Sequence, residues 1–543
     1  MSSIFRRFPL DGPSLGLASL TLILGLLLIS PSLGDMGGDS AQYLSLGRAL
    51  AEGVGYRDTH LPTTPIHLHY PPGFPLLLAG VWLVFGGGSY IPFKILVLLC
   101  SALGLYGMGR ALSARFGRRI GLGAVGMSLG LTPFLLQSVR IQSEGPYLLF
   151  LGLFLWFGTE EAGKEKGGQP CAARGIPWPA LFVFALLGFS MRVGGMVLFL
   201  ALGLSALRVW RQTRQRGPLV WGLAGALPVL GWFLVAETSG GGTWSYGREW
   251  AALQGGRISE LLGSASFYFQ AIGASIGGSP QVAASVFLTG GLTLLVLFGW
   301  GVAIRSQGWR LMDSVLLFSL LLALLAPMRS LRYLIPVFPL LSAYFLRGLS
   351  FLWSKAPLPR SSQEGQALTV SALALALFHF YASTDLYRDR WKDRDVLPNE
   401  AVILGLEKVR MNHWEEGLLL SGPRGSAVRE AYGDFLLLLQ ALRRGKVLPR
   451  PTLLAARKPR LVAWMTGIPC LPLPAYKEGR NWVETLRSQG VSHVIEDGLF
   501  RQTQVLFRRL RREKGDPGLT TVLRIRRAAL HGLALPPASP KGG

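Results

Sequence analysis

Long apolar runs separated by short basic segments dominate the first 384 residues of the chain. The runs long enough to cross a bilayer, or nearly so, lie at about 14–34, 90–109, 119–137, 144–159, 177–207, 218–236, 283–304, 312–327, 332–350 and 366–384. A helix of about 20 apolar residues satisfies its own backbone polar groups while it crosses the hydrocarbon core. The pattern therefore predicts an α-helical polytopic membrane protein.

The run at 177–207 is too long for one crossing, and Arg192 interrupts it near the middle. Basic segments precede it (KEKGGQPCAARG) and follow it (RVWRQTRQR), and positive flanks indicate the cytoplasmic side. The run must then cross the membrane an even number of times. We expect two short helices that turn near Arg192 at the outer face, or a re-entrant hairpin. With the split, the expected total is about 11 transmembrane helices.

The other basic loops set the orientation. RALSARFGRR (110–119), RSQGWR (305–310) and the stretch from Arg347 to Arg360 share one side if the N-terminus is cytoplasmic. The chain after residue 384 then lies outside the cytoplasm. That segment is itself basic, but the positive-inside bias acts on short loops, and long domains cross largely regardless of charge.

The transmembrane domain, expected at 1–384, contains two outer loops at 35–75 and 237–282. The second loop is rich in glycine, serine and aromatic residues. The apolar segment 74–86 is short and is closed by three glycines, so it either lies in the membrane interface or lengthens the second span.

The C-terminal part has a different pattern. Residues 385–530 mix strand-like runs (LLLS, RLVAWM, SHVIED) with the helical stretch Glu430–Arg444, which predicts a small extracytoplasmic α/β domain. The tail 531–543, which contains PPASPKGG, is predicted to be disordered.

Composition agrees with the membrane prediction. Half of the residues are hydrophobic, the mean hydropathy is +0.37, and charged residues make up 16% of the chain, against roughly 25% in a soluble domain. The net charge of +25 would suggest nucleic acid in a soluble protein. Here the basic residues cluster between apolar runs and no nucleic-acid module is present, so topology and anionic headgroups explain the charge better.

Polar residues near the membrane on the outer side are the candidates for function, because charge at that position is costly to bury. They are Asp35, Asp39, Tyr43, the segment HLHYPPG (67–73), Arg140, Glu144, Arg192, Arg329 and Arg332. Arginines bind phosphate through forked, charge-assisted hydrogen bonds, and a nearby carboxylate can act as a general base. The combination favours transfer of a group from a lipid phosphate, whose developing charge the arginines would stabilise.

Structural alternatives remain open for these residues. Asp39 has the type and position of a helix N-cap, for a helix that begins near Ser40. Glu144 has the position of a first-turn acid that interacts with the helix dipole, and Arg329 and Arg332 have that of membrane anchors.

The histidines of HLHYPPG form another candidate. His67 and His69 have metal-like spacing, but they lie in a loop between Pro65 and Pro71, which favours the wall of a pocket over a metal site.

Several segments resemble one glycosyltransferase family. GDSAQYLSLGRALAEGVGY followed by HYPPGFPLLLA is similar to the first outer loop of GT-C glycosyltransferases, and more narrowly of the protein O-mannosyltransferase and lipid A aminoarabinose transferase group. SVRIQSEGPYLLFLGLFLW, SMRVGGMVLFLAL and MRSLRYLIPVFPLL resemble later motifs of that group, in the same order. The resemblance covers about residues 14–385, and Ser40 stands where the family has a second acid.

The resemblance implies a bacterial-type, inner-membrane enzyme that inverts the anomeric centre of a sugar carried on polyprenyl phosphate. Asp39 would be the catalytic base, and Glu144 would hold the acceptor or orient the site. Arg192, Arg329 and Arg332 would bind the lipid phosphate. The pocket would be lined by Tyr43, His69, Tyr70 and Tyr333. No cofactor is implied, and a divalent metal is not expected. The acceptor would be a glycolipid, a polysaccharide or a protein.

Two other functions remain open. A ligase or polymerase of lipid-linked saccharides would share the outer arginines without depending on Asp39. A lipid flippase or transporter would need a polar path, and few charges lie inside the spans, apart from Lys94, Arg192 and Asp313. That scarcity disfavours ion-coupled transport but leaves lipid flipping open.

Overall fold

A computed structural model describes residues 11–31, 33, 38–159, 177–238, 257–276, 286–326, 329–355, 423–445, 453–473, 482–499, 501–512 and 519–533. The chain forms two compact units. The first, which we call the helical unit, comprises Met1–Ile29, Leu68–Phe74 and Ile91–Tyr387. The second, the mixed unit, comprises Ser30–His67, Pro75–Tyr90 and Arg388–Gly543. The first outer loop and the C-terminal part thus belong to one unit, which differs from the single division at residue 384 expected from the sequence.

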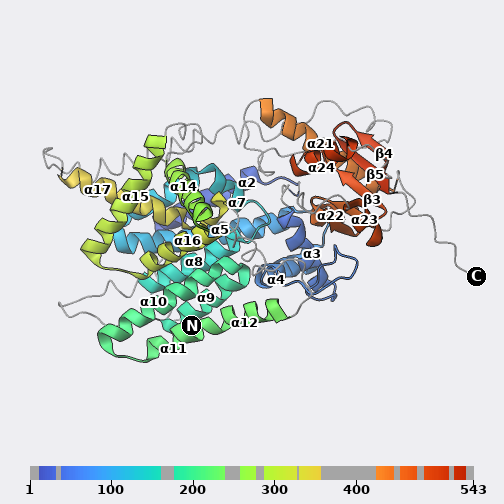
Figure 1. The fold of residues 1–543 in the computed structure, drawn as a ribbon. Coiled ribbons are helices and arrows are strands. Elements are labelled where there is room, and N and C mark those ends of the chain that lie inside the picture. Colours follow the sequence, from blue (N-terminus) through green and yellow to red (C-terminus); the bar gives the residue numbers. More distant parts are fainter. Residues whose placement is uncertain are drawn as a thin grey trace, which may run out of the picture. The chain divides into compact units, whose positions relative to one another are not determined.

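The described part of the helical unit consists largely of apolar helices (Figure 1). They are α2 (Gly12–Leu28), α5 (Ile91–Phe116), α6 (Arg118–Gly130), α7 (Thr132–Ser138), α8 (Glu144–Thr159), α9 (Trp178–Met191), α10 (Met196–Thr213), α11 (Gly217–Ala224), α12 (Ala226–Thr238), α14 (Arg257–Ile276), α15 (Val286–Gln307), α16 (Leu311–Leu325) and α17 (Phe338–Lys355). Short 3-10 turns lie at η2 (Val193–Gly195), η5 (Leu331–Tyr333) and η6 (Ile335–Val337).

The polytopic helical class is confirmed, but the expected number of spans is corrected. Within the described residues, 5 helices are long and apolar enough to cross a membrane: Ile91–Phe116, Val193–Thr213, Gly217–Ala236, Phe287–Gln307 and Ile335–Lys355. Shorter apolar helices, among them Trp178–Met191 and Leu311–Leu325, account for other runs. The run at 119–137 breaks at Leu131, where Thr132 and Pro133 begin a new helix, so apolar length alone overcounts crossings. The run at 366–384 lies outside the described residues.

The predicted break at Arg192 is confirmed. Helix α9 ends at Met191, Arg192 is extended (φ −160°, ψ 149°), and α10 begins at Met196 after one 3-10 turn. A Cβ atom at Gly195 would collide with the backbone of Gly188, so α10 begins in direct contact with the end of α9. Glycine at this position permits the tight reversal.

Glycines also fix helix α8, whose first residue is Glu144. A Cβ atom at Gly104 of α5 would come 2.6 Å from the Leu148 carbonyl carbon of α8, and one at Gly107 would come 2.7 Å from that of Gly152. The two backbones are therefore in contact, as small residues allow between membrane helices.

The expected outer loop at 237–282 is partly a helix. Residues Arg257–Ile276 form α14, which packs against α15 and α16. A Cβ atom at Gly273 would collide with the backbone of Thr289 in α15. Some of the glycines and serines that suggested a loop therefore lie where two helices pack closely. Composition alone does not distinguish such positions from turns.

The mixed unit contains a five-stranded sheet, which agrees with the predicted C-terminal α/β domain (Figure 1). The strands are β1 (Leu454–Ala456), β2 (Cys470–Pro472), β3 (His493–Glu496), β4 (Leu519–Ile525) and β5 (Ala528–Leu533), in the order β2-β1-β3-β5-β4. Strand β1 is parallel to β2 and β3, and β5 is antiparallel to β3 and β4. The helices of this unit are α3 (Asp39–Ala51), most of α4 (Gly73–Phe85), α21 (Pro423–Arg443), α22 (Pro459–Thr466), α23 (Trp482–Ser488) and α24 (Arg501–Arg512).

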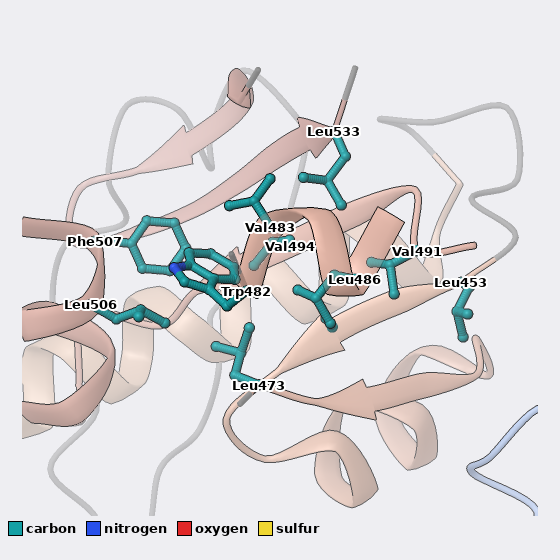
Figure 2. Close-up of a cluster of buried hydrophobic side chains, with 11 residues drawn as sticks. Leu453, Leu473, Trp482, Val483, Leu486, Val491, Val494, Leu506, Phe507 and Leu533 are labelled. Atoms are coloured by element: carbon teal, nitrogen blue, oxygen red, sulfur yellow. The ribbon is translucent and has the colours of Figure 1, made fainter. Parts of the chain in front are cut away.

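Apolar side chains from α23, α24 and the sheet form the core of this domain (Figure 2). Trp482 packs edge-on against Phe507, with ring centroids 6.0 Å apart, and Leu486 and Val494 are buried beside them. Burial of one such side chain contributes about 1.5–3 kcal/mol, so the cluster stabilises the sheet and the helices packed on it.

Two details of the C-terminal prediction are wrong and two are confirmed. RLVAWM is not a strand but lies in α22, where Pro459 begins the helix and Gly467 (φ 74°) ends it. The expected tail begins too early, because β5 continues to Leu533. The helical stretch Glu430–Arg444 is confirmed as α21, and SHVIED as β3. LLLS lies outside the described residues.

Helix α22 joins the C-terminal domain to the outer-loop helices within the mixed unit. Trp464 donates a hydrogen bond of 3.0 Å to the Tyr90 hydroxyl and packs edge-on against Trp82 of α4, with ring centroids 6.1 Å apart. A Cβ atom at Gly38 would lie 3.7 Å from that of Leu461. The start of α3 therefore rests on α22.

Candidate functional site

Three predicted site residues from distant parts of the helical unit meet at one carboxylate. Arg332 Nε donates a hydrogen bond to Glu144 Oε1, and its Nη2 lies 3.4 Å from Oε2. Arg192 Nη1 lies 3.1 Å from Glu144 Oε1. The carboxylate is 2% exposed, whereas the Arg192 and Arg332 side chains are 13% and 27% exposed. We call these residues the Glu144 cluster.

Local structure places each member of the Glu144 cluster. Glu144 is the first residue of α8, Arg192 occupies the extended break between α9 and α10, and Arg332 lies in η5 just before the span Ile335–Lys355. The Ser330 hydroxyl accepts a hydrogen bond from the Arg332 backbone N–H, which fixes that turn. All three are thus at helix ends, where the backbone changes direction.

The Glu144 cluster carries an excess of positive charge. Two guanidinium groups face one carboxylate, and each guanidinium has five N–H donors, more than two oxygens can accept. The guanidinium of Arg192 also lies 5.7 Å from the Tyr147 ring centroid. Guanidinium groups of this kind bind phosphate through charge-assisted hydrogen bonds.

A helix-dipole role for Glu144 and a membrane-anchor role for Arg332 do not explain all the contacts of these residues. Glu144 does lie in the first turn of α8, as a dipole partner would, but it also pairs with two arginines. Arg332 turns inward to that carboxylate, which a simple headgroup anchor would not do.

The other predicted residues of the helical unit have separate surroundings. Arg329 is exposed, and its Nε lies 3.4 Å from the Ser264 hydroxyl of α14. Tyr333 follows Arg332 in η5 and is partly buried.

His69 and Tyr70 lie with their rings edge-on, centroids 4.6 Å apart. Their segment packs at Gly73 against Ser190, whose carbonyl carbon would lie 2.8 Å from an added Cβ atom. The segment therefore runs close to the break at Arg192.

Asp39 and Tyr43 belong to the mixed unit. Helix α3 begins at Asp39 itself, its N-cap is Gly38 (φ 84°), and no side chain caps it, so the N-cap interpretation of Asp39 is wrong. The left-handed backbone at Gly38 is the reason, since it lets the chain enter the helix one residue earlier. Tyr43 is 2% exposed and packs inside the unit. Asp35 lies outside the described residues.

A cluster that the sequence analysis missed lies behind α3, around Asp58. Asp58 Oδ1 accepts hydrogen bonds from Gln42 Nε2 at 2.7 Å and from His67 Nδ1 at 2.8 Å, and His60 Nδ1 is 3.7 Å away. In the sequence, this cluster is indicated only by an aspartate and a histidine two residues apart, Asp58 and His60, in a polar loop. We call these residues the Asp58 cluster.

Burial and charge shift the pKa values of this cluster. Burial lowers the pKa of His60 to about 4 and also lowers that of His67. The pKa of Asp58 is lowered, because the hydrogen bond and the charge of His67 outweigh burial of its carboxyl group. At neutral pH the cluster therefore holds a carboxylate beside neutral histidines.

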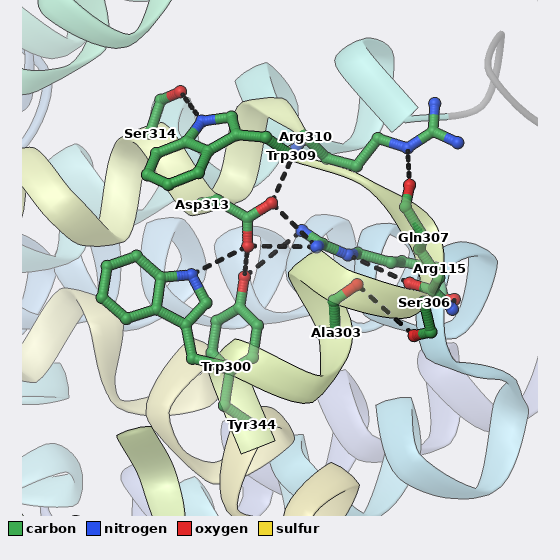
Figure 3. A network of polar contacts seen from close by, with 10 residues as sticks. All are labelled: Arg115, Trp300, Ala303, Ser306, Gln307, Trp309, Arg310, Asp313, Ser314 and Tyr344. Carbon is green, nitrogen blue, oxygen red and sulfur yellow. Dashed lines mark hydrogen bonds and ion pairs between the residues drawn. The ribbon is translucent and has the colours of Figure 1, made fainter. Parts of the chain in front are cut away.

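A second buried acid of the helical unit, Asp313, is fully occupied (Figure 3). Its oxygens accept from Arg115 Nη2 at 2.8 and 3.0 Å, Trp300 Nε1 at 2.9 Å, the Tyr344 hydroxyl at 2.6 Å and the Arg310 backbone N–H at 2.6 Å. These partners tie α5, α15, α16 and α17 together. Asp313 is 0% and Arg115 4% exposed, so this network is closed to ligands.

A metal centre has no support in the part of the chain that the structure describes. No group of three or more histidine, cysteine, aspartate or glutamate residues there is arranged to hold a metal ion. His67 and His69 fall in different units, and His67 is engaged by Asp58.

Comparison with known proteins gives a structural match and no sequence match. No family model and no curated protein matches the chain. The crystal structure of ArnT from Cupriavidus metallidurans in the apo state aligns with a TM-score of 0.52 and 13% identity, over 95% of this chain and 96% of that one. The same protein bound to undecaprenyl phosphate gives 0.51 and 12%, over 95% and 97%. The chain therefore has the fold of ArnT.

A weaker likeness is to the archaeal oligosaccharyltransferase AglB from Archaeoglobus fulgidus in complex with an inhibitory peptide and a dolichol-phosphate. It has a TM-score of 0.48 and 12% identity, over 89% of this chain and 69% of that one. At this score the match carries no argument.

Proposed function

We propose that this protein is an inverting glycosyltransferase that moves a monosaccharide from a polyprenyl-phosphate donor to an acceptor outside the cytoplasm. The observation that carries the proposal is the Glu144 cluster, in which two arginines exceed one buried carboxylate. The ArnT fold supports it, because one of the matched structures holds undecaprenyl phosphate. Arg192 and Arg332, with Arg329 nearby in sequence, would bind the phosphate.

The proposed reaction is a single displacement. The acceptor oxygen forms a bond to the anomeric carbon while the bond from that carbon to the phosphate oxygen breaks. The electron pair leaves with the phosphate, where the arginines stabilise the charge, and the acceptor proton goes to the Asp39 carboxylate. Tyr43, His69, Tyr70 and Tyr333 remain proposed lining residues, and Glu144 orients the arginines or the acceptor. The reaction needs no cofactor.

The proposal includes the location. The protein would lie in the inner membrane with a cytoplasmic N-terminus, and the acceptor would be a glycolipid, a polysaccharide or a protein. The proposal assigns the base to a residue of the mixed unit and the phosphate ligands to residues of the helical unit.

The test is mass spectrometry of envelope glycolipids and glycoproteins from a strain without the gene, complemented with variants. The wild type should restore a missing sugar, and Asp39→Asn should not, although purified Asp39→Asn protein should still bind undecaprenyl phosphate. Loss of a general base lowers turnover by about 10²–10⁴-fold.

Glu52→Gln is the matched control. Glu52 is the C-cap of the same helix and forms an exposed pair with Arg48, so this variant should restore the sugar fully. Full restoration by Asp39→Asn would overturn the proposal in favour of a flippase or of a ligase that does not use Asp39.

A further inference from the structure

The Asp58 cluster connects the loop after α3 to the first turns of that helix. Gln42 of α3 donates a hydrogen bond of 2.7 Å to Asp58 Oδ1, and Ser45, three residues further on, shares one of 2.7 Å with Thr59. Gln42 and Ser45 are three residues apart, so both hydrogen bonds hold the same face of α3.

Two backbone hydrogen bonds close the loop that contains Asp58. The Asp58 backbone N–H donates to the Pro65 carbonyl at 2.8 Å, and the His67 N–H donates to the Tyr56 carbonyl at 2.9 Å. The Tyr56 ring lies edge-on to the His67 ring, centroids 5.4 Å apart. Gln42 and His67 are each 1% exposed, so their bonds to Asp58 are shielded from water.

The C-terminal domain supports the same loop. The Cys470 backbone N–H of β2 donates a hydrogen bond of 3.0 Å to the His60 carbonyl. Asp58 therefore lies in a segment held from one side by the sheet and from the other by α3.

Asp39 lies three residues before Gln42 on α3, and this spacing places the two on one face of the helix. The first turn of α3 has no side-chain cap, because its N-cap is Gly38. The bond from Gln42 to Asp58 therefore holds the face of α3 on which Asp39 lies.

We propose that Asp58 is a positioning residue that holds the first turns of α3, and with them Asp39, in the orientation needed for group transfer. The inference rests on the proposed function for the role of Asp39. Asp58 acts through Gln42 and takes no part in the reaction.

The test is hydrogen exchange of the full-length protein in lipid nanodiscs, compared with binding of undecaprenyl phosphate and with complementation of the deletion strain. In Asp58→Ala, amides of residues 39–45 should exchange about tenfold faster or more, because a buried hydrogen-bonded charge is lost. Exchange in α17 and binding of undecaprenyl phosphate should stay within about threefold of wild type, whereas the envelope sugar should fall about tenfold.

Two further variants keep the result decisive. Asp58→Asn retains one oxygen acceptor and should restore most of the protection of α3, and Glu52→Gln should change nothing. Unchanged exchange at 39–45 in Asp58→Ala, or equal acceleration across both units, would overturn the proposal. The exchange result is independent of the reaction. If Asp39→Asn proves active while Asp58→Ala accelerates exchange at 39–45, the proposed function fails but Asp58 still orders α3.

Discussion

Two buried acids among the described residues of the helical unit, Asp313 and Glu144, have surroundings that differ in charge and exposure. Asp313 has one arginine and three further donors, its carboxylate is 0% exposed, and the pair is electrically neutral. Glu144 is almost as buried at 2%, but it faces two arginines that are 13% and 27% exposed. The first arrangement pairs one arginine with one acid away from solvent, whereas the second brings two partly exposed arginines to one buried acid.

The number and exposure of the cations around a buried acid suggest whether that acid is structural or belongs to a binding site. A buried acid whose lone pairs are all occupied joins helices, and removing it leaves an uncompensated charge. A buried acid outnumbered by partly exposed cations organises those cations for an additional anion. By this criterion we propose the Glu144 cluster as the ligand site, and the Asp313 network joins helices α5, α15, α16 and α17.

The largest effect that would test this contrast is expected from Asp313→Ala. The change leaves the Arg115 guanidinium buried without its carboxylate and should lower the free energy of unfolding by about 3–5 kcal/mol. Thermal unfolding of the purified protein in detergent measures it. Undecaprenyl phosphate binding per folded molecule should be unchanged, and a specific loss of binding would make Asp313 part of the site.

A third acid, Asp58, lies beside histidines instead of arginines, so the stability that it and its partners contribute depends on pH. The folded pKa of His60 is about 4, below the ordinary 6.5, so between these values the unfolded chain binds more protons. The free energy of unfolding should therefore fall as pH drops from 6.5 to 4, by about 3 kcal/mol for this group. The lowered pKa of His67 adds to the fall, and that of Asp58 extends it below the ordinary value of 3.8.

Denaturant unfolding between pH 7 and pH 4 checks this expectation. His60→Gln should flatten the pH dependence, since glutamine does not titrate. His493→Gln is the comparison variant. Burial lowers the pKa of His493 too, but this side chain is only half-buried, so its replacement should flatten the pH dependence less. Equal pH dependence in wild type and His60→Gln would contradict the assignment.

The smallest effect in free energy is expected from Arg332→Gln, and it concerns binding rather than folding. One guanidinium would remain beside Glu144, so the affinity for undecaprenyl phosphate should fall about 10–100-fold, which corresponds to about 1.4–2.8 kcal/mol. Isothermal titration or a scintillation proximity assay measures it. Arg310→Gln is the control, because the Arg310 side chain is exposed and only its backbone contacts Asp313. Equal losses in both variants would mean that only net charge matters.

Parts of the site could be predicted because their signals are local. A charge inside an apolar run marks a break, and the structure breaks at Arg192. Acids and arginines at the ends of apolar runs were recognised without knowledge of their partners. The Asp58 cluster was missed because its residues lie in a short polar loop, where sequence offers no periodicity and burial cannot be read.

The sequence by itself determined that this chain is a polytopic helical protein with a small α/β domain, because apolar length and periodicity follow from the transfer of each segment out of water. It also identified Glu144, Arg192 and Arg332 as candidates. Only the tertiary structure decided that Arg192 and Arg332 both pair with the Glu144 carboxylate. It also decided that Gly38 rather than Asp39 is the N-cap of α3, and that Asp58 accepts a hydrogen bond from this helix. The reason is distance along the chain: Glu144 and Arg332 are 188 residues apart, and nothing local in either segment specifies the other.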